Sequence, residues 1–287
     1  MRRHRTIRHL VACGSILVAI AGCGGGHANE RHASIDDSMT FDEALDAGAS
    51  ILWLGAHPDD ETVPGAILAR ACAGLGNPCT LVVFTRGDGG TCFIQSCPPD
   101  LGTFRAAEME EAARRYGAAL ELYEFTNYPG STTPVDVVRA TWESEGDPLG
   151  VAVEAIRRLR PNILLSFDPS RGFTDHTEHE LAGILTEEAA AHAADPAYVT
   201  PDQRPYRADR LYHIVNRYPG LELFIPPDDG PVTEKTSMKV PCPAAGTDCL
   251  SAGLEAADAH HSQWPFILGM QLGTLVWNEA LLKRVDF

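Results

Sequence analysis

The strongest constraint on the fold of this chain is a regular alternation of short apolar runs with longer amphipathic segments. The runs at 50–56, 80–85, 120–127, 162–169 and 210–218 have the length and composition of strands. Between them, residues 63–76, 102–118, 149–161 and 178–194 have the apolar spacing of helices. Strands that alternate with helices need crossover connections, which build a mostly parallel sheet covered by helices on both faces. The sequence therefore predicts an α/β, Rossmann-like fold.

The length of the chain, 287 residues, suits one sizeable α/β domain. We assign residues 46–287 to this single domain, because no internal repeat divides them. The segment 219–250 is rich in Pro, Gly and Asp. We interpret it as a long loop or a small excursion inside the domain, and not as a domain of its own.

The first 22 residues have the pattern of an export signal. Arginines at positions 2, 3, 5 and 8 precede an apolar stretch, Leu10 to Ala21, that is too short to span a membrane as a mature helix. The stretch ends in Ile-Ala-Gly-Cys at 20–23, which resembles the lipobox of bacterial lipoproteins. This resemblance implies cleavage before Cys23 and lipidation of its thiol. The alternative is an ordinary cleaved signal peptide followed by a chance cysteine.

With a lipid on Cys23, residues 23–45 would form a flexible tether, since they begin Gly-rich and polar. The protein would then be exported and anchored in the bacterial cell envelope, in the periplasm or on the outer surface. A nucleic-acid partner is not expected. The chain has 23 Lys and Arg against 39 Asp and Glu, a net charge of −16, whereas phosphate binding needs clustered basic residues. The sequence makes no prediction of oligomeric state.

Six further cysteines fall into three pairs that are close in sequence: Cys72 and Cys79, Cys92 and Cys97, Cys242 and Cys249. An even number of cysteines in an exported chain favours disulfides. A structural zinc site is the alternative, although no pair has the two-residue spacing of a metal knuckle. Disulfides between such close neighbours would fix loops more than they would stabilise the whole fold.

Polar clusters follow three of the predicted strands. These are AHPDDE at 56–61, TRGDGG at 85–90 and FDPSRGFTDHTEH at 167–179. Open parallel sheets place their sites at the carboxyl ends of the strands. We therefore expect the three clusters to meet at one edge of the sheet.

The histidines and acids of these clusters are suited to binding a metal ion. His57 and Asp60 lie on the turn that leaves the first strand, and His176 and His179 are three residues apart at a predicted helix start, on nearly the same face. One carboxylate and two imidazoles suit Zn²⁺ with an open position for water, and the same donors suit Fe²⁺. A bound water would have its pKa lowered towards ~7, and Asp59 could take its proton.

Each motif also has a purely structural interpretation. HPDD at 57–60 can be a capping turn in which Asp accepts backbone N–H bonds. HTEH at 176–179 can be a solvated helix start, where Glu is favoured by the helix dipole. The placement of both motifs after strands, at the same edge, favours a functional site.

AHPDDE, together with the later HTEHELAG at 176–183, resembles the PIG-L/LmbE family of zinc-dependent N-acetylglucosaminyl deacetylases. The likeness extends over about residues 50–265 and includes TRGDGG, the R-x-x-E helix that begins near 104, the segment 156–169 and HHSQ at 260–263. It implies an LmbE-like fold and hydrolysis of an N-acetyl amide. Carried over by position, His57, Asp60 and His179 would be metal ligands, Asp59 the general base, and His176 the histidine that stabilises the oxyanion.

Two departures from the family pattern lie in the second motif. Thr177 replaces a proline, and Glu178 replaces an aspartate that orients the first histidine, so the support of His176 stays open. A competing register would make His176 the ligand and would put Phe173 in the place of the acid histidine. We prefer the first register because it keeps both histidines and matches Gly183.

Two further residues are candidate substrate-binding groups through the same resemblance. Arg105 occupies the R-x-x-E position, where an ion pair with Glu108 is the alternative. His260, in HHSQ, is either part of the site or a packed core group. The segment 122–130 departs from the family's usual Asp-Gly ending, and we expect it to line the sugar pocket.

We therefore expect a zinc-dependent hydrolase of an N-acetyl group on an amino sugar or a related saccharide or glycoconjugate, acting outside the cytoplasm. A sugar-binding lipoprotein without turnover is one alternative. It is disfavoured by the retained Asp59 and His176, because binding alone needs no base beside a metal. A metal hydrolase of an ester or phosphoester is the other. The lack of a basic cluster near HPDDE makes a phosphate substrate less suitable.

Overall fold

Five parallel strands form the centre of the sheet, as the alternation predicts. The structure is a computed structural model, which describes residues 7–8, 35–95, 97–201 and 203–287. The central strands lie in the order β4 (Ala119–Phe125), β3 (Cys79–Thr85), β2 (Ile51–Gly55), β5 (Ile163–Phe167) and β6 (Arg210–Ile214). Every residue of β2, β3, β5 and β6 is buried, as expected for strands covered on both faces. The strand order reverses between β2 and β5, which makes this point the expected place for a ligand site.

Antiparallel strands complete both edges of the sheet. β10 (Glu279–Val285) pairs with β6, and β7 (Glu234–Ser237) pairs with β10. At the other edge, the two residues of β1 (Ile7–Arg8) pair with β4. β8 (Pro241–Cys242) and β9 (Thr247–Asp248) form a separate ribbon. The segment 219–250 is therefore an excursion inside the domain and not only a loop, because it contains β7 of the main sheet and the β8–β9 ribbon.

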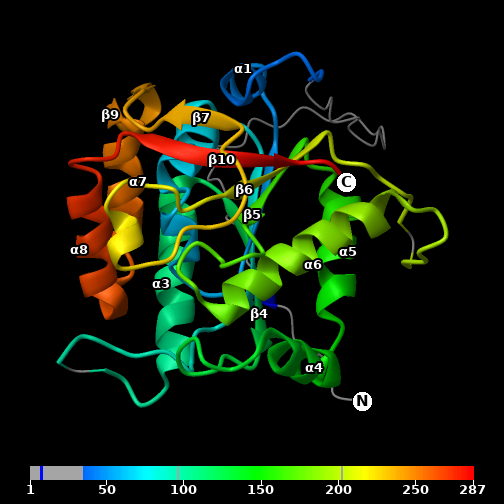
Figure 1. Cartoon of the computed structure of the whole chain (residues 1–287), viewed down its shortest axis with the longest axis horizontal. Coiled ribbons are helices and arrows are strands. Elements are labelled where there is room, and N and C mark those ends of the chain that lie inside the picture. Colours follow the sequence, from blue (N-terminus) through cyan, green and yellow to red (C-terminus); the bar gives the residue numbers. More distant parts are fainter. Residues whose placement is uncertain (1–6, 9–34, 96, 202) are drawn as a thin grey trace, which may run out of the picture.

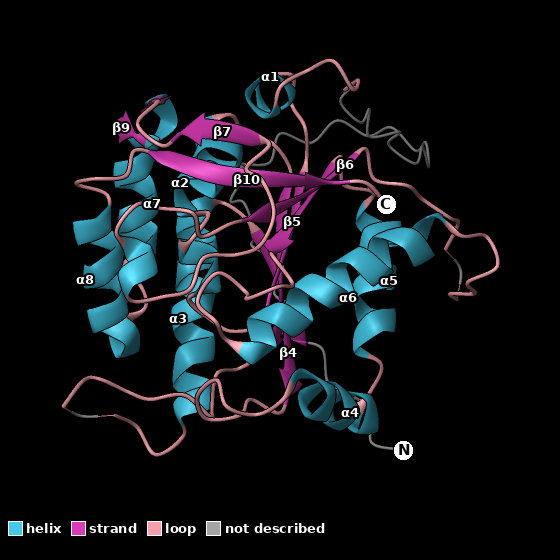
Figure 2. Ribbon diagram, in the orientation of Figure 1, coloured by secondary structure: helices cyan, strands magenta, loops and turns pink. Residues whose placement is uncertain are grey.

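Helices cover both faces of the sheet (Figures 1 and 2). One face carries α1 (Phe41–Asp46), α2 (Gly65–Leu68), α3 (Leu101–Tyr116), α7 (Cys249–Ala257) and α8 (Trp264–Gly273). The other carries α4 (Val135–Glu145), α5 (Pro148–Leu159) and α6 (Thr177–Ala194). Alternate residues of β2 divide between the two cores, with Trp53 in one and Leu52 and Leu54 in the other.

The N-terminal boundary of the domain lies earlier than predicted. Thr40 and Glu43 cap each other at the start of α1, in a reciprocal capping box. Phe41 and Leu45 of this helix are buried in the core, and the ring of Phe41 meets Tyr212 of β6 edge-on. The tether predicted for 23–45 therefore ends before α1. The predicted signal peptide and the lipidated Cys23 lie outside the described residues, apart from positions 7 and 8 of the signal.

The predicted helix at 63–76 is irregular in the structure. A 3₁₀ turn (Asp60–Thr62) leads into the short α2, which continues as a π-helical segment (Ala69–Gly74). The disulfide Cys72–Cys79 ties this segment to the start of β3. In the described ranges, no helix has both the length and the apolar character needed to cross a membrane.

Two of the three predicted disulfides are confirmed, Cys72–Cys79 and Cys92–Cys97. The third is wrong, because Cys242 and Cys249 are free thiols. Both are buried, and their sulfur atoms donate to the carbonyl oxygens of Ala69 and Pro241 instead. These two thiols are therefore part of the core beneath α7.

Candidate active site

A pocket of about 390 Å³ opens at the carboxyl edge of the sheet, where the strand order reverses. Its lining comes from the segments that follow four parallel strands and from the start of α8. These segments supply His57 after β2, Gly90 after β3, Asn127 after β4 and His176 after β5. The predicted convergence of the three polar clusters is thus confirmed, as is the prediction that 122–130 contributes to the wall.

The turn after β2 holds two acids in different orientations. Asp60 is 4% exposed, and its Oδ2 accepts the backbone N–H groups of Ala56 at 2.7 Å and His57 at 2.8 Å. Its second oxygen is left facing the pocket histidines. Asp59 has φ +101°, a left-handed conformation that a non-glycine residue adopts at a cost. The turn fixes this backbone and so directs the Asp59 carboxylate into the pocket.

Three side-chain atoms from His57, Asp60 and His179 surround one point. Nδ1 of His57 lies 3.1 Å from Nε2 of His179, which lies 2.9 Å from Oδ1 of Asp60. The remaining separation, from His57 Nδ1 to Asp60 Oδ1, is 3.5 Å. A tetrahedral zinc ion with bonds of about 2.0–2.1 Å would space its ligand atoms by about 3.4 Å. The separations therefore fit the predicted ligand set.

The outer partners of the two histidines decide which nitrogen faces that point. Nε2 of His57 contacts the carboxylate of Glu178, and Nδ1 of His179 lies 3.0 Å from the carbonyl oxygen of Gly172. A carboxylate and a carbonyl accept hydrogen bonds, so these two ring nitrogens carry the protons. When both rings are neutral, the nitrogens that face each other carry lone pairs, with a carboxylate oxygen beside them. Such a donor set is suited to a cation at its centre, either a proton or a metal ion.

The pKa values of His57 and Asp60 also show that the cluster favours a positive charge. Burial alone would lower the pKa of His57, but the carboxylates of Asp60 and Glu178 outweigh it and raise the pKa to about 10. Burial would raise the pKa of Asp60, yet His179 and His57 hold it well below its usual range. The site is thus negative unless it takes up a proton or a metal ion.

Glu178 has a role that the sequence left open. Its side chain is 1% exposed and lies behind the pocket lining, where it meets His57 and accepts from Asn127 Nδ2 and from the Tyr128 backbone N–H, both at 2.7 Å. The carboxylate therefore orients His57 and not His176. His176 is instead contacted by the backbone N–H of Glu178, which donates to its Nδ1 at 3.3 Å.

His176 lies at the N-cap of α6, beside the ligand set. Its ring centroid is 4.8 Å from the rings of both His57 and His179. Burial and the charges of these two neighbours lower the pKa of His176 to about 2, so the ring is neutral. Because Nδ1 accepts the Glu178 N–H, the proton of the neutral ring lies on Nε2. His176 can therefore donate a hydrogen bond to a ligand.

A ligand set of three histidines is the alternative at this centre. One nitrogen from each of His57, His176 and His179 lies within 4.8 Å of the others. The set with Asp60 is more compact, because Oδ1 of Asp60 lies 2.9 Å from His179 Nε2 and 3.5 Å from His57 Nδ1. The competing sequence register, which makes His176 the ligand, would put Phe173 in the place of the acid histidine. Phe173 is 5% exposed, and its ring meets Phe167 in the core, which favours His179 as the ligand.

Arg105 lines the pocket and pairs with Asp59. Its Nη2 lies 2.9 Å from Asp59 Oδ1, and its Nη1 donates to the carbonyl of Gly87 at 3.0 Å. Burial raises the pKa of Asp59, and the positive charge of Arg105 opposes this shift. The alternative pairing of Arg105 with Glu108 is not observed, because Glu108 accepts from the backbone N–H and hydroxyl of Ser262 at 2.7 and 2.6 Å.

His260 is not in the pocket wall, which corrects its prediction as a substrate-binding residue. It is 1% exposed and lies behind the turn, with Nε2 2.7 Å from Oε1 of Glu61. The other oxygen of Glu61 accepts the backbone N–H of Asp59 at 3.1 Å. His260 and Glu61 therefore support the Asp59 backbone from behind. Glu61 is the last acid of the HPDDE motif and was the sequence signal for this pair. Its partner, His260, lies 199 residues further along the chain.

Two residues that the sequence did not single out hold the loop before α6. The carboxylate of Asp228 accepts the backbone N–H groups of Phe173 at 3.1 Å and Asn216 at 2.6 Å. Nδ2 of Asn216 donates to the carbonyl of Phe173 at 3.0 Å. Phe173 and Asp175 have φ +66° and +61°, so this loop depends on such external hydrogen bonds. The loop carries the Gly172 carbonyl that orients His179.

Comparisons with known proteins agree with this site. The family model PIG-L, described as GlcNAc-PI de-N-acetylase, matches residues 52–190. A 1D-myo-inositol 2-acetamido-2-deoxy-alpha-D-glucopyranoside deacetylase from Thermobifida fusca strain YX is 29% identical over 230 residues, which are 72% of this chain and 77% of that protein. The match of the family model includes both histidine motifs of the pocket.

Solved structures share the fold. The N,N'-diacetylchitobiose deacetylase of Pyrococcus horikoshii is 19% identical, with a TM-score of 0.55, over 88% of this chain and 95% of that chain. The 4-carboxy-2-hydroxymuconate hydratase of Pseudomonas putida KT2440 is 18% identical, with a TM-score of 0.59, over 83% and 97%. Since these two proteins carry out different reactions, the fold alone leaves the reaction open. Residues 52–190, which carry both histidine motifs of the pocket, are similar to the PIG-L family.

Proposed function

We propose that this protein is a metal-dependent deacetylase that removes the acetyl group from an N-acetylglucosamine unit of a saccharide or glycoconjugate. The observation that carries the proposal is the Asp59 carboxylate in the same pocket as the convergent atoms of His57, Asp60 and His179. The activity named for the Thermobifida relative supports an amide of an amino sugar as the bond that is cleaved.

We take Zn²⁺ as the ion, since two imidazoles and a carboxylate are donors typical of catalytic zinc, with Fe²⁺ as the alternative. Held by His57, Asp60 and His179, the ion would polarise the acetyl carbonyl and acidify the attacking water. The fit of this site to a metal ion depends on Nδ1 of His57 and Nε2 of His179, whose lone pairs face each other, and on Oδ1 of Asp60 beside them.

Asp59 acts as the general base. Its carboxylate takes a proton from the water as the water oxygen adds to the acetyl carbon. Arg105 fixes the orientation of that carboxylate through the 2.9 Å contact, and burial raises its pKa, which strengthens it as a base. When the C–N bond breaks, the proton held by Asp59 passes to the nitrogen, and the products are acetate and the free amine.

His176 stabilises the negative charge that develops on the carbonyl oxygen. Its neutral ring carries the proton on Nε2, and the side chain lines the pocket. A donor aimed at the oxyanion is worth more in a water-poor pocket than in bulk solvent. A neutral ring also avoids placing a second positive charge beside the ligand set.

Two other functions fit the fold less well. A sugar-binding lipoprotein without turnover would need no base, yet Asp59 is held in a strained conformation with a dedicated arginine partner. A phosphoester hydrolase would need further cations at the pocket. Arg105 is the one Lys or Arg in the described lining, and it already pairs with Asp59.

We also propose that the protein works outside the cytoplasm, attached to a membrane by a lipid on Cys23. The basic start, the apolar stretch and the lipobox-like residues 20–23 support export and lipidation. The disulfides Cys72–Cys79 and Cys92–Cys97 support an oxidising compartment.

The test is acetate release from methyl N-acetyl-glucosaminide and N,N'-diacetylchitobiose by the purified protein loaded with Zn²⁺. We expect equal amounts of acetate and free amine from the wild type. Asp59→Asn should lower kcat by about 10²–10⁴-fold, because it removes the base. Asp88→Asn, an exposed aspartate on the neighbouring loop, is the matched control and should keep full activity. Metal binding without acetate release from any N-acetyl saccharide would overturn the proposal in favour of a binding protein.

A further inference from the structure

We propose that Phe93 forms a subsite for the part of the substrate beyond the amino sugar, and that this part presents a flat apolar face. The inference rests on the proposed function and narrows its substrate class. Phe93 lies at the mouth of the pocket, within the six-residue ring closed by the disulfide Cys92–Cys97. The amino sugar itself would occupy the pocket floor, beside Asp59 and His176.

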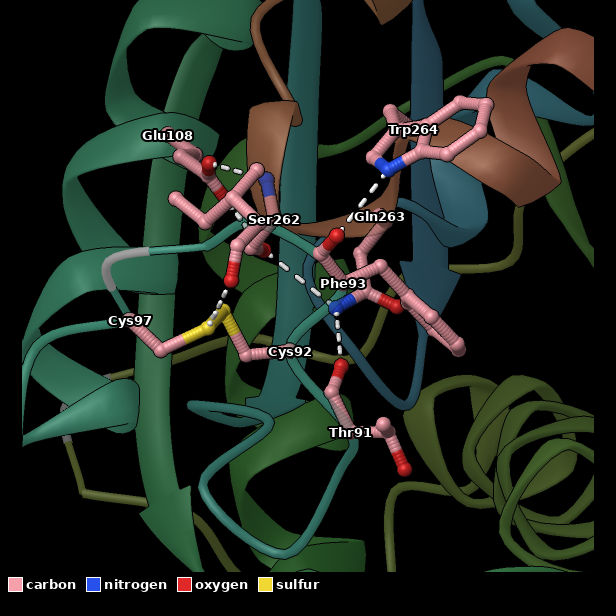
Figure 3. The surroundings of a disulfide bond; sticks show 9 residues. Thr91, Cys92, Phe93, Cys97, Glu108, Ser262, Gln263 and Trp264 are labelled. Atoms are coloured by element: carbon pink, nitrogen blue, oxygen red, sulfur yellow. Dashed lines mark hydrogen bonds between the residues drawn. A yellow bond between two sulfur atoms is a disulfide. The ribbon is translucent and has the colours of Figure 1, made fainter.

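The backbone around Phe93 is fixed from one side by the start of α8 (Figure 3). The N–H of Phe93 donates to the carbonyl of Ser262 at 2.9 Å, and its own carbonyl accepts from Nε1 of Trp264 at 3.0 Å. Two residues earlier, the carbonyl of Thr91 accepts from Nε2 of Gln263 at 2.7 Å. Three hydrogen bonds therefore hold this segment, which is neither helix nor strand.

The support of this segment is itself rigid. Ser262 is fully buried, and both its N–H and its hydroxyl donate to the carboxylate of Glu108. Glu108 is 6% exposed and belongs to the long helix α3. Phe93 is thus connected through Ser262 to the frame of the domain, and its position relative to the pocket floor is set.

The disulfide acts on this segment and not on the stability of the whole fold. Stabilisation by a disulfide grows with the length of the loop that it closes, and Cys92 and Cys97 are five positions apart. Neither cysteine is buried in the core. What this bond does restrict is the freedom of the residues beside Phe93, which preorganises the wall of the pocket.

The side chain of Phe93 is left in solvent although its backbone is fixed. It is 49% exposed, and it lines the pocket together with Phe266. Trp264, which bonds the Phe93 carbonyl, is 50% exposed, and Leu268, one turn further along α8, is 43% exposed. Tyr128 is a further aromatic residue of the pocket lining. An exposed aromatic side chain on a fixed backbone, beside a polar pocket, is suited to stacking against a flat apolar group at little entropic cost, because only its two side-chain torsions have to be ordered.

The experiment compares two substrates, phenyl and methyl N-acetyl-β-D-glucosaminide, which differ in the group beyond the sugar. For the wild type we expect a lower KM for the phenyl compound. Phe93→Ala should raise that KM about tenfold with kcat changed less than twofold, because contacts made equally in the ground and transition states affect KM alone. The KM for the methyl compound should not change.

The two disulfides provide a matched pair of double variants. Cys92→Ser with Cys97→Ser should raise the KM for the phenyl compound in the same direction as Phe93→Ala. Cys72→Ser with Cys79→Ser removes the other disulfide, which lies away from the pocket, and should leave the ratio of the two KM values unchanged. Equal effects of Phe93→Ala on both substrates, or no effect on either, would overturn the subsite.

A calorimetric titration separates failure of the subsite from failure of the proposed function. If the wild type releases acetate from neither compound, the proposed function is wrong. The subsite is then judged by binding of phenyl N-acetyl-β-D-glucosaminide alone. We expect binding to the wild type to be about tenfold tighter than to Phe93→Ala, a difference of about 1.4 kcal/mol. Equal affinity would overturn the subsite.

Discussion

At the scale of single residues, Glu178 determines the orientation of His57, which we propose as a metal ligand. The family pattern puts an aspartate at this position, next to the histidine that it orients. The longer glutamate instead reaches His57 and also accepts from Asn127 and from the backbone of Tyr128. Carboxylates that hold the outer nitrogen of a metal-binding histidine raise its basicity and fix its orientation.

We predict that Glu178→Gln weakens zinc binding by about 10–100-fold, since the amide is neutral and its NH₂ group would face the N–H donors of the site. A competitive chelator titration measures the change. Glu180→Gln, which alters a more exposed glutamate on the same turn of α6, is the control and should bind zinc like the wild type. An unchanged Kd in Glu178→Gln would contradict the assigned role.

Asp228 supports the site from a distance, through the loop before α6. We predict that Asp228→Ala lowers the free energy of unfolding by about 2 kcal/mol or more, because it leaves the buried N–H groups of Phe173 and Asn216 without an acceptor. Denaturant unfolding measures this loss. Asp229→Ala, at the exposed neighbouring position, should change stability by less than about 0.5 kcal/mol. Equal stabilities of the two variants would show that the loop does not depend on Asp228.

The residues that local motifs predict are those that touch the pocket. His57, Asp59, Asp60, His176 and His179 all follow from two short stretches, and all five line it. The contacts behind them do not follow from any single stretch. Glu61 and His260 each lie in a quoted motif but are 199 positions apart, and Asp228 lies 55 positions from Phe173. Such partners are set by the packing of distant segments, which no local pattern records.

At the scale of elements, α6 is positioned by a close approach to β5. A Cβ at Gly183 would lie 2.5 Å from the carbonyl oxygen of Phe167 and 3.1 Å from the backbone of Pro169. Glycine at this point therefore lets the helix approach the strand end. The same helix carries His176 at its N-cap and His179 in its first turn, so the approach sets the distance of both histidines from the turn after β2.

We predict that Gly183→Ala destabilises the protein by about 1–3 kcal/mol, because α6 must move away from β5. Activity should fall with it, as the histidines shift. Gly269→Ala on α8 is the matched control, since a Cβ there meets nothing within 4 Å. The control should be neutral or stabilised by up to about 1 kcal/mol through helix propensity. Thermal unfolding of the two variants measures the difference, and equal Tm values would contradict the close approach.

The elements that the sequence predicted are those of the parallel βα units. β2, β3, β5 and β6 are mainly apolar and fully buried, because both of their faces are covered. β7 and β10 were not predicted. They are antiparallel strands with mixed polarity, EKTS and EALLKRV, so the alternation of apolar strands and amphipathic helices gives no signal for them. The helices α4, α7 and α8 were also not predicted.

At the scale of the whole molecule, the chain combines an acidic domain with a basic, apolar N-terminus. We predict that the full-length protein partitions into the detergent phase when it is expressed in a bacterial host, and that Cys23→Ala moves it to the aqueous phase. Cys13→Ala, inside the signal, should still partition with detergent. Wild-type protein in the aqueous phase would contradict lipidation, although not the enzymatic activity.

The central claim is that His57, Asp60 and His179 bind one divalent ion that the reaction needs. Metal analysis by inductively coupled plasma mass spectrometry, run alongside acetate release on the same samples, tests it most directly. We predict about one zinc per wild-type chain and loss of both metal and acetate release in His179→Ala, whereas His192→Ala, at the far end of α6, retains both. Wild-type protein that stays metal-free when offered Zn²⁺ yet still releases acetate, or a His179→Ala variant that keeps its full zinc, would contradict the account.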